Sequence, residues 1–156
     1  MRTVRGTLAF VPQRAAIPLR LPVTVRDVVA VGEWGRLGLR RRMTADSRTR
    51  VDHALERVDM GALARQPFGV LSGGQRQRTL LAQGLVRGAD VLLLDEPTTG
   101  LDVASRHGIR QVMREEADRG AAVICVSHDA DVIADADRVV PLVDGRVAGE
   151  WNAARR

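Results

Sequence analysis

Lysine, tyrosine and long apolar runs are all missing from this chain of 156 residues, and it has a single cysteine. No run approaches the about 18 apolar residues that a membrane helix needs, so any membrane contact falls to a partner. The first residues, MRTVRGTLAF, lack the apolar core of a signal peptide. Cys125 stands in the apolar run AAVICVS, which predicts a small buried hydrophobe rather than a nucleophile or half of a disulfide. We therefore expect a cytoplasmic protein.

Because lysine is absent, all 24 basic residues are arginines; they face 19 acidic residues and leave a net charge of +5. Acidic and basic residues are interleaved over most of the chain, and the one compact basic run is Arg40-Arg41-Arg42. Such a run is more typical of a solvated face than of a binding patch. Aromatic residues make up only 3% of the chain, which leaves few surfaces for stacking bases. We expect no nucleic-acid partner.

Hydrophobic spacing predicts a largely helical stretch after a short strand over about 7–11. Thr24 and Asp27 have the spacing of a capping box, which predicts a short helix through Val31. A glycine-rich connector follows over 32–38, and then a helix over about 45–60, ended by Gly61. That second helix places one apolar stripe at intervals of three and four residues: Val51, Ala54, Leu55 and Val58.

After Leu71 the pattern alternates between helix and strand. It predicts helices over 73–87 and 103–119, the latter capped by Asp102, and buried strands in VLLLD and AAVICVS. Continuously apolar strands between helices indicate a parallel sheet covered on both faces. The residues from 138 onward predict a hairpin with its turn at Asp144-Gly145. The fold class is α/β.

Two adjacent acids, Asp95 and Glu96, end the apolar strand VLLLD. Open α/β sheets bind their ligands at the carboxyl ends of the strands, where two carboxylates suit a metal ion and a general base. In this Walker B-like pattern Asp95 would hold Mg²⁺ through its water shell and Glu96 would deprotonate a water. The alternative is a strand-ending turn with two solvated acids, and the motif alone leaves both open.

A serine and two glycines, Ser72 to Gly74, precede the helix predicted over 73–87. Ser72 can cap that helix, and the glycines leave its first N–H groups uncovered, so the turn can bind an anion. Taken together, LSGGQ followed by VLLLDEP resembles the ATPases of ABC transporters. The resemblance covers nearly the whole chain and implies an incomplete P-loop NTPase-like parallel sheet with a helical signature subdomain, over about 24–88, and an α/β core, over 1–23 and 89–156.

The resemblance also implies ATP and Mg²⁺ as ligands and assigns roles to residues. Ser72, Gly73, Gly74 and Gln75 match the signature, which contacts the γ-phosphate of ATP held by a second ATPase subunit. Asp95 matches the Walker B aspartate, and Glu96 the catalytic glutamate.

Three further positions match the family by their order along the chain. Gln13 in VPQ matches the glutamine that senses Mg²⁺ and the attacking water. Asp102 in TGLD matches the loop that crosses the dimer interface. His128 in VSHD matches the switch histidine that contacts the γ-phosphate. Alone, a glutamine or a histidine after a strand is more often structural, and the shared order favours the functional interpretation.

The helical segment between Gln13 and the signature is where a membrane permease subunit docks in this family. Its residues VPQRAAIPLRLPVTVRDVVAVG, and EPTTGLD further on, are most similar to the branch that imports manganese, zinc or iron. The resemblance thus implies a cytoplasmic protein peripheral to the inner face of the membrane.

The family's P-loop, G-x-x-x-x-G-K-[ST], has no counterpart here, since the chain lacks lysine. A strand, loop and helix need about 30 residues, and 12 precede Gln13. We therefore expect a domain without its front portion. Losing the lysine and several N–H donors removes about 6–10 kcal/mol, whereas a micromolar ligand binds with about 8 kcal/mol. We expect no useful ATP binding by the chain alone.

Three functions remain open at this stage. The first is the ATPase subunit of a metal-ion importer, present as an incomplete sequence. The second is a docking or regulatory remnant that has lost catalysis, which a P-loop encoded upstream in the same frame would eliminate. The third is a soluble ABC ATPase acting on nucleic acid, which would need a second cassette or coiled-coil arms.

Overall fold

The computed structural model describes residues 8–14, 17–18, 20–34, 43–149 and 151–152, which form two compact units. The first unit is Met1–Val126 and the second Ser127–Arg156. The run Arg40-Arg41-Arg42 lies outside the described residues. Within the described part of the chain, no helix is both long and apolar enough to cross a membrane. The proposed division into a helical subdomain and an α/β core stays a prediction.

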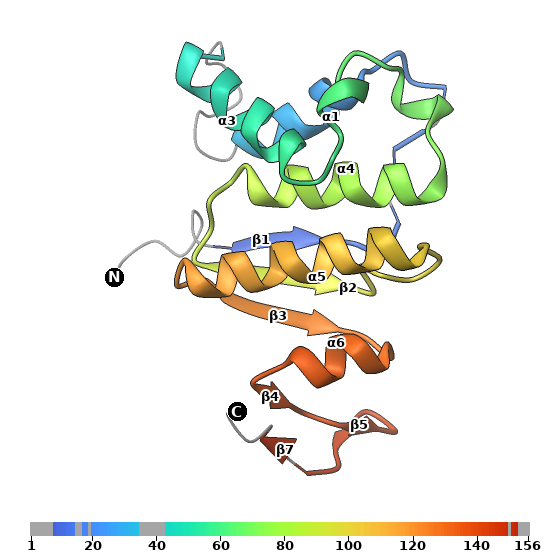
Figure 1. Cartoon of the computed structure of the whole chain (residues 1–156), viewed down its shortest axis with the longest axis vertical. Helices are drawn as coiled ribbons and strands as arrows, with labels where there is room; N and C mark the ends of the chain where they lie inside the picture. The colour runs from blue at the N-terminus through green and yellow to red at the C-terminus, as the bar shows by residue number, and fades with distance from the viewer. Residues whose placement is uncertain (1–7, 15–16, 19, 35–42, 150, 153–156) are drawn as a thin grey trace. The chain divides into compact units, whose positions relative to one another are not determined.

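The first unit contains a parallel sheet, as the apolar runs predict. Its strands are β1 (Leu8–Val11), β2 (Val91–Asp95) and β3 (Ala122–Val126), in the order β1-β2-β3. Leu8, Val91 and Ala122 stand side by side, and so do Val11, Leu94 and Cys125. The strands therefore end at the same edge of the sheet (Figure 1).

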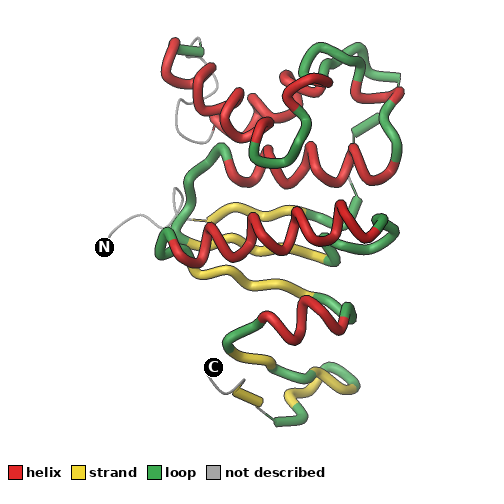
Figure 2. Tube along the Cα trace, viewed as in Figure 1, coloured by secondary structure: helices red, strands yellow, loops and turns green. Residues whose placement is uncertain are grey.

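Helices fill the chain between the first two strands and join the last two (Figure 2). The elements before β2 are α1 (Val25–Ala30), η2 (Val31–Glu33), α3 (Ala45–Glu56), η3 (Gly61–Leu63), η4 (Phe68–Val70) and α4 (Gly73–Leu85). The helix α5 (Val103–Asp118) connects β2 to β3. The predicted capping box of α1 is confirmed, because the N–H of Asp27 donates to Thr24 Oγ1 and the N–H of Thr24 donates to Asp27 Oδ2.

One predicted boundary in the helical part is wrong, and one predicted connector is partly helical. The helix α3 ends at Glu56 rather than at Met60, because Asp59 takes a left-handed φ of 55° and the N–H of Met60 turns back to the carbonyl of Leu55. Val58 is still buried, so the predicted apolar stripe holds beyond the helix end. The glycine-rich connector begins as the η2 turn, in which Gly32 is buried; residues 35–38 lie outside the described residues.

The core lies on one face of the sheet. Ala9, Val11, Leu92 and Leu94 are buried on that face and belong to the same cluster as residues of α4 and α5. The helix α4 crosses β1 so closely that a Cβ atom on Gly84 would lie 2.6 Å from Val11 Cγ2. Two helices therefore bury one face of the parallel sheet.

The prediction that both faces are covered is wrong for the described residues. Leu8, Phe10, Ile124 and Val126 are about half exposed, at 46%, 55%, 52% and 53%. They alternate with the buried positions, so they form the opposite face of the same sheet. The strand β3 is therefore not fully buried, and Cys125, expected to be buried, is only half-buried. An apolar run favours burial, but burying β3 also requires elements that pack on both of its faces.

The second unit contains a short helix and a nested hairpin. The helix α6 spans Ala130–Asp135, the outer strands β4 (Arg138–Val139) and β7 (Trp151–Asn152) pair antiparallel, and the inner strands are β5 (Leu142–Val143) and β6 (Arg146–Val147). The predicted turn is confirmed: Asp144 and Gly145 have φ values of 49° and 73°, which suit a tight two-residue hairpin.

Candidate functional site

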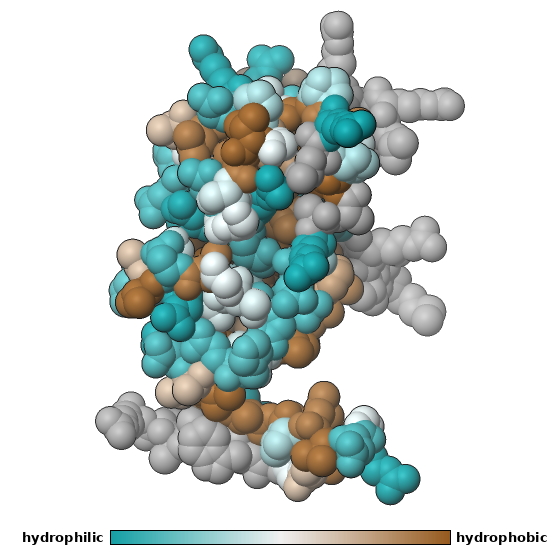
Figure 3. Space-filling view, turned by 90° about the vertical axis from the view of Figure 1, so that its right-hand side faces the viewer, coloured by the Kyte–Doolittle hydropathy of each residue, from teal (hydrophilic) through white to brown (hydrophobic). Residues whose placement is uncertain are grey.

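Most of the predicted site residues stand at one end of the first unit. The strands β1 and β2 end there, and the helices α4 and α5 begin there (Figure 1). Gln13, the Ser72 to Gln75 turn, the pair Asp95 and Glu96, and Asp102 follow from these element ends. Figure 3 views the molecule from this side, and hydrophilic residues prevail there in the middle of the surface. The end of the sheet thus combines polar side chains with two helix N-termini.

The turn before α4 is a complete capping box. The N–H of Gln75 donates to Ser72 Oγ over 3.3 Å, and the N–H of Ser72 donates to Gln75 Oε1 over 2.9 Å. Arg76 Nη2 reaches back to the carbonyl of Gly69 over 3.1 Å. The side chains of Ser72 and Gln75 therefore close the turn, whereas the first N–H groups of a helix have no partner inside it.

The two glycines of this turn differ in their surroundings. A Cβ atom on Gly73 would meet nothing within 4 Å, so the backbone is open to an approaching group. A Cβ atom on Gly74 would lie 3.1 Å from Leu101 Cδ2. Leu101 directly precedes Asp102, so the start of α4 touches the loop that leads into α5. Gly73 suits ligand approach, and Gly74 suits close packing.

Glu96 directly follows β2 and has a left-handed φ of 47°. Its N–H donates to the carbonyl of Val126 over 2.9 Å, which joins the ends of β2 and β3. Its Oε2 accepts a hydrogen bond of 3.0 Å from Thr99 Oγ1. Glu96 and Asp95 are both half-buried. A left-handed backbone at a non-glycine residue costs energy and is often retained at functional sites.

Asp102 is exposed and caps α5. Its two carboxylate oxygens accept hydrogen bonds from the N–H of Ser105, over 2.9 Å, and from Ser105 Oγ, over 2.8 Å. The backbone hydrogen bond and then the hydroxyl hydrogen bond from Ser105 lower the pKa of Asp102. This carboxylate is therefore charged at neutral pH and fixed to the helix start.

The remaining two predicted residues, Gln13 and His128, each follow the end of a strand. Gln13 is exposed, two residues beyond the end of β1. His128 is exposed and belongs to the second unit, two residues after β3. The described geometry brings Gln13 to the end of the sheet and leaves the relation of His128 to it a prediction.

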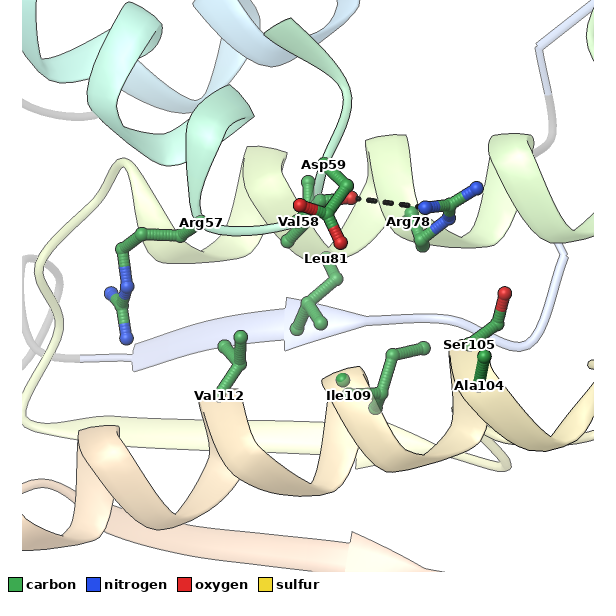
Figure 4. A pocket seen from close by; sticks show the side chains of 10 residues that line it. Arg57, Val58, Asp59, Arg78, Leu81, Ala104, Ser105, Ile109 and Val112 are labelled. Atoms are coloured by element: carbon green, nitrogen blue, oxygen red, sulfur yellow. Dashed lines mark hydrogen bonds between the residues drawn. The ribbon is translucent and has the colours of Figure 1, made fainter.

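A cavity of about 120 Å³ lies beside the site, between α5 and the residues after α3. Its walls are apolar at Leu81, Ile109 and Val112 (Figure 4). Arg78 Nη1 crosses its upper wall to the carbonyl of Val58, over 3.5 Å. None of the predicted site residues lines it. The cavity is a packing gap next to the candidate site.

The residues present fit one half of a nucleotide site. The open backbone at Gly73 suits a phosphate, and the half-buried carboxylate of Asp95 suits a hydrated cation. No lysine is available among the 156 residues to grip the β- and γ-phosphates. Among the described residues, no three His, Cys, Asp or Glu side chains gather as a metal cage. The residues therefore fit the signature half of a shared nucleotide site, without the lysine half.

Three contacts at this end go beyond the predicted cap at Asp102. Thr99 holds Glu96, Ser105 holds Asp102, and Leu101 packs on Gly74. Thr99 and Ser105 each stand three residues after the carboxylate that they bind, a spacing typical of turns and caps, and could have been inferred from it. The contact of Leu101 with Gly74 joins distant segments and left no local signal.

Comparisons with known proteins agree with this geometry. The family model described as "ABC transporter" matches residues 1–99. The zinc transport system ATP-binding protein TroB of Treponema pallidum is 38% identical over 94% of this chain and 55% of its own length. The manganese transport system ATP-binding protein MntB of Listeria innocua is 38% identical over 83% of this chain and 54% of its own length. The chain spans about half the length of the curated relatives it matches.

Solved structures share the fold. A dimeric bacterial ABC transporter cassette, MJ0796, superposes with a TM-score of 0.82 at 27% identity, over 96% of this chain and 64% of the cassette. An inward-facing structure of a metal-chelate type ABC transporter gives a TM-score of 0.76 at 26% identity, over 86% of this chain and 54% of the other. The α/β fold class and the parallel sheet are thereby confirmed.

Proposed function

Because this chain belongs to the ABC transporter family, we propose that it serves as an ATP-binding subunit of a metal-ion importer, for zinc or manganese. The observation that carries the proposal is the Ser72 to Gln75 turn, with its open backbone at Gly73, at the same end of the sheet as Asp95 and Glu96. The metal specificity is supported by the relatives, which are named for zinc and manganese transport. The metal ion is cargo carried by a membrane permease subunit.

In this proposal the ATP site is shared between two subunits. The N–H groups of Gly73 and Gly74 contact the terminal phosphate of a nucleotide that the second subunit holds. Ser72 and Gln75 keep these groups aligned through the capping box. The dimeric cassette among the solved relatives supports such a pairing. The chain thus contributes its signature turn to a partner's nucleotide.

The other residues act on the nucleotide bound to the chain's own side of the dimer. When bound, ATP supplies the phosphoanhydride bond, and Mg²⁺ supplies the positive charge that polarises it. Asp95 would hold the hydrated Mg²⁺, and a carboxylate oxygen of Glu96 would accept the proton of the attacking water. Gln13 would orient that water, and His128 would contact the γ-phosphate. Asp102 lies at the dimer interface. A P-loop must be joined to this side for it to function.

A titration tests the missing half directly. We expect the isolated chain to show no micromolar binding of Mg-ATP in a calorimeter, because charge-assisted hydrogen bonds worth about 6–10 kcal/mol are absent. A micromolar isotherm would contradict this expectation and place a phosphate grip elsewhere in the chain.

A complementation assay tests the signature turn. The partner is the full-length MntB of Bacillus subtilis, which is 35% identical to this chain. Its ATPase activity is first abolished by a substitution in its own signature turn. The present chain is then added. We expect ATPase activity to return, because the added chain supplies the turn to MntB's nucleotide. Glu96→Gln in the added chain should leave this activity unchanged, since Glu96 serves the other side. Once a P-loop segment is joined to the chain, the same substitution should abolish turnover on that side.

The matched variants are Gly73→Glu and Ala45→Glu. Each adds one carboxylate at the exposed first residue of a helix, α4 or α3. Gly73→Glu should abolish the restored activity by repelling the phosphate, and Ala45→Glu should leave it intact. Equal effects of the two variants would rule out a phosphate at this turn.

A docking or regulatory role without catalysis is the second candidate. It predicts binding to the permease subunit with no change in ATPase rate in the mixture. Association with nucleic acid is a third and weaker possibility, for which the sequence offers few aromatic residues.

A further inference from the structure

A polar contact ties the end of α3 to α5. Arg57 is the first residue after α3, and its side chain is only 21% exposed. Arg57 Nη1 donates to Glu116 Oε1 over 2.6 Å, and Arg57 Nη2 donates to Glu115 Oε2 over 2.9 Å. One arginine therefore spans two neighbouring carboxylates of α5, a bidentate role that suits its planar head group.

The same network of polar contacts extends to the residues just before β2. Glu116 is 4% exposed, and its second oxygen, Oε2, accepts a hydrogen bond of 2.6 Å from Arg119 Nη2. Arg119 Nη2 also donates to the carbonyl of Ala89 over 2.8 Å, just before β2 begins. A line of polar contacts thus runs from α3 through Glu116 to the strand that ends in Asp95.

The buried carboxylate is charged at neutral pH. Burial acts to raise the pKa of Glu116, but the hydrogen bonds from Arg119 and Arg57 outweigh it and leave that pKa below its usual value. Two arginines and two glutamates make the group neutral as a whole. Breaking such a buried pair leaves one charge without its partner, which is costly.

The helix α5 meets the helical segment, taken from here on as α1 to α4, at both of its ends. Leu101, at its beginning, packs against Gly74 of the signature turn, and Glu115 and Glu116, at its far end, hold Arg57. A helix of 16 residues separates these two contacts by about 24 Å. The cavity of about 120 Å³ lies between them, with Arg57 at one end and Ser105 at the other (Figure 4).

We propose that Arg57 is a positioning residue, which fixes the helical segment on α5 and thereby sets where the signature turn stands relative to Asp95 and Glu96. One cluster of buried apolar residues joins the segment to the sheet and to α5, and the ion pair adds a polar contact between the end of α3 and the far end of α5. Without Arg57 that contact is lost, and the angle between the segment and α5 is set by apolar packing alone, which is non-directional. The consequence for catalysis rests on the proposed function, whereas the orientation itself does not.

Spin labels can measure this orientation without any nucleotide. The labels are attached through Val70→Cys, two residues before Ser72, and His107→Cys in α5, both at exposed positions. Cys125→Ala removes the native thiol. We expect a narrow distance distribution in the parent chain and a shifted, broadened one in Arg57→Met. Arg57→Lys should recover part of the narrow distribution, because an ammonium can still bind one of the two carboxylates.

Arg26→Met is the matched control. Arg26 also lies in the helical segment and pairs with Asp52, but both side chains are exposed, at 39% and 43%. Its loss should not change the distribution. If Arg57→Met does not fold, Glu115→Ala removes only the outer contact and should still broaden the distribution. An unchanged distribution in a folded Arg57→Met, or in Glu115→Ala when Arg57→Met does not fold, overturns the proposal.

The complementation assay supplies a second readout. Arg57→Met in the added chain should lower kcat several-fold and leave KM for ATP nearly unchanged, because MntB binds the nucleotide. If no chain restores activity, the proposed function fails while the distance measurement still decides the role of Arg57. A changed distance with an unchanged kcat limits Arg57 to shaping the fold and overturns its link to the site.

Discussion

The two faces of the sheet in the first unit have equally apolar residues and different surroundings. On one face Val11 and Leu94 are fully buried beneath the helices. On the other face Phe10 and Ile124 are about half exposed. Since both sets alternate along the same strands, their hydropathy alone does not tell them apart. The difference shows that burial depends on which elements the chain supplies to each face.

The largest expected difference between the faces is in unfolding free energy. Leu94→Ala should lower it by about 2–5 kcal/mol, because a fully buried leucine leaves a cavity. Phe10→Ala should cost less than about 1 kcal/mol, because half of that side chain already contacts water. Urea unfolding followed by circular dichroism measures both. Equal losses would mean that something covers the exposed face in solution.

The close packing of α4 on the covered face gives a smaller effect. Gly84→Ala should destabilise by about 1–3 kcal/mol, because the new Cβ would press on Val11. Gly108→Ala in α5 is the control, because a Cβ there meets nothing within 4 Å. It should instead stabilise by up to about 1 kcal/mol through helix propensity. Thermal melts compare the two, and destabilisation by both would show that α5 packs more tightly than described.

The ion pairs that hold α5 on the covered face should depend on pH. Because the folded pKa of Glu116 lies below the unfolded one, its contribution is present above the unfolded pKa and is lost as pH falls through the folded pKa. Glu116→Gln should therefore cost about 1–3 kcal/mol at neutral pH. The gap to the parent should shrink below a pH of about 4. A gap that stays constant down to acid pH would contradict this assignment.

The smallest effect on stability is expected on the exposed face. Ile124→Thr keeps a β-branched residue and should change the unfolding free energy by less than about 1 kcal/mol. It should nevertheless reduce self-association, because exposed apolar patches promote it. Sedimentation of the parent and the variant tests this. Val31→Thr, at an exposed position of η2, is the control and should not alter association.

Local patterns were sufficient for the elements and for most of the candidate site. The capping boxes at Thr24 and Ser72 and the turn at Asp144-Gly145 are each formed by residues within a few positions of one another. The end of β2 at Asp95 follows from one apolar run. These features are produced by interactions between near neighbours, so they can be predicted from the sequence.

The contacts between distant segments could not be predicted in the same way. Arg57 and Glu116 are separated by 59 residues, and no local pattern pairs one arginine with one of many glutamates. The helix α3 ends at Glu56 because Asp59 has a left-handed backbone, and this could not be predicted because the residue is not a glycine. The half-exposed state of Cys125 depends on which face of β3 is covered.

The sequence alone determined the order of helices and strands, their caps and the residues at the strand ends, because spacing and turn chemistry act between near neighbours. Only the tertiary structure decided which sheet face is buried, how Gly74 meets Leu101 and how Arg57 is paired. Those outcomes depend on elements that meet in space, and the free energy of each contact belongs to both partners at once.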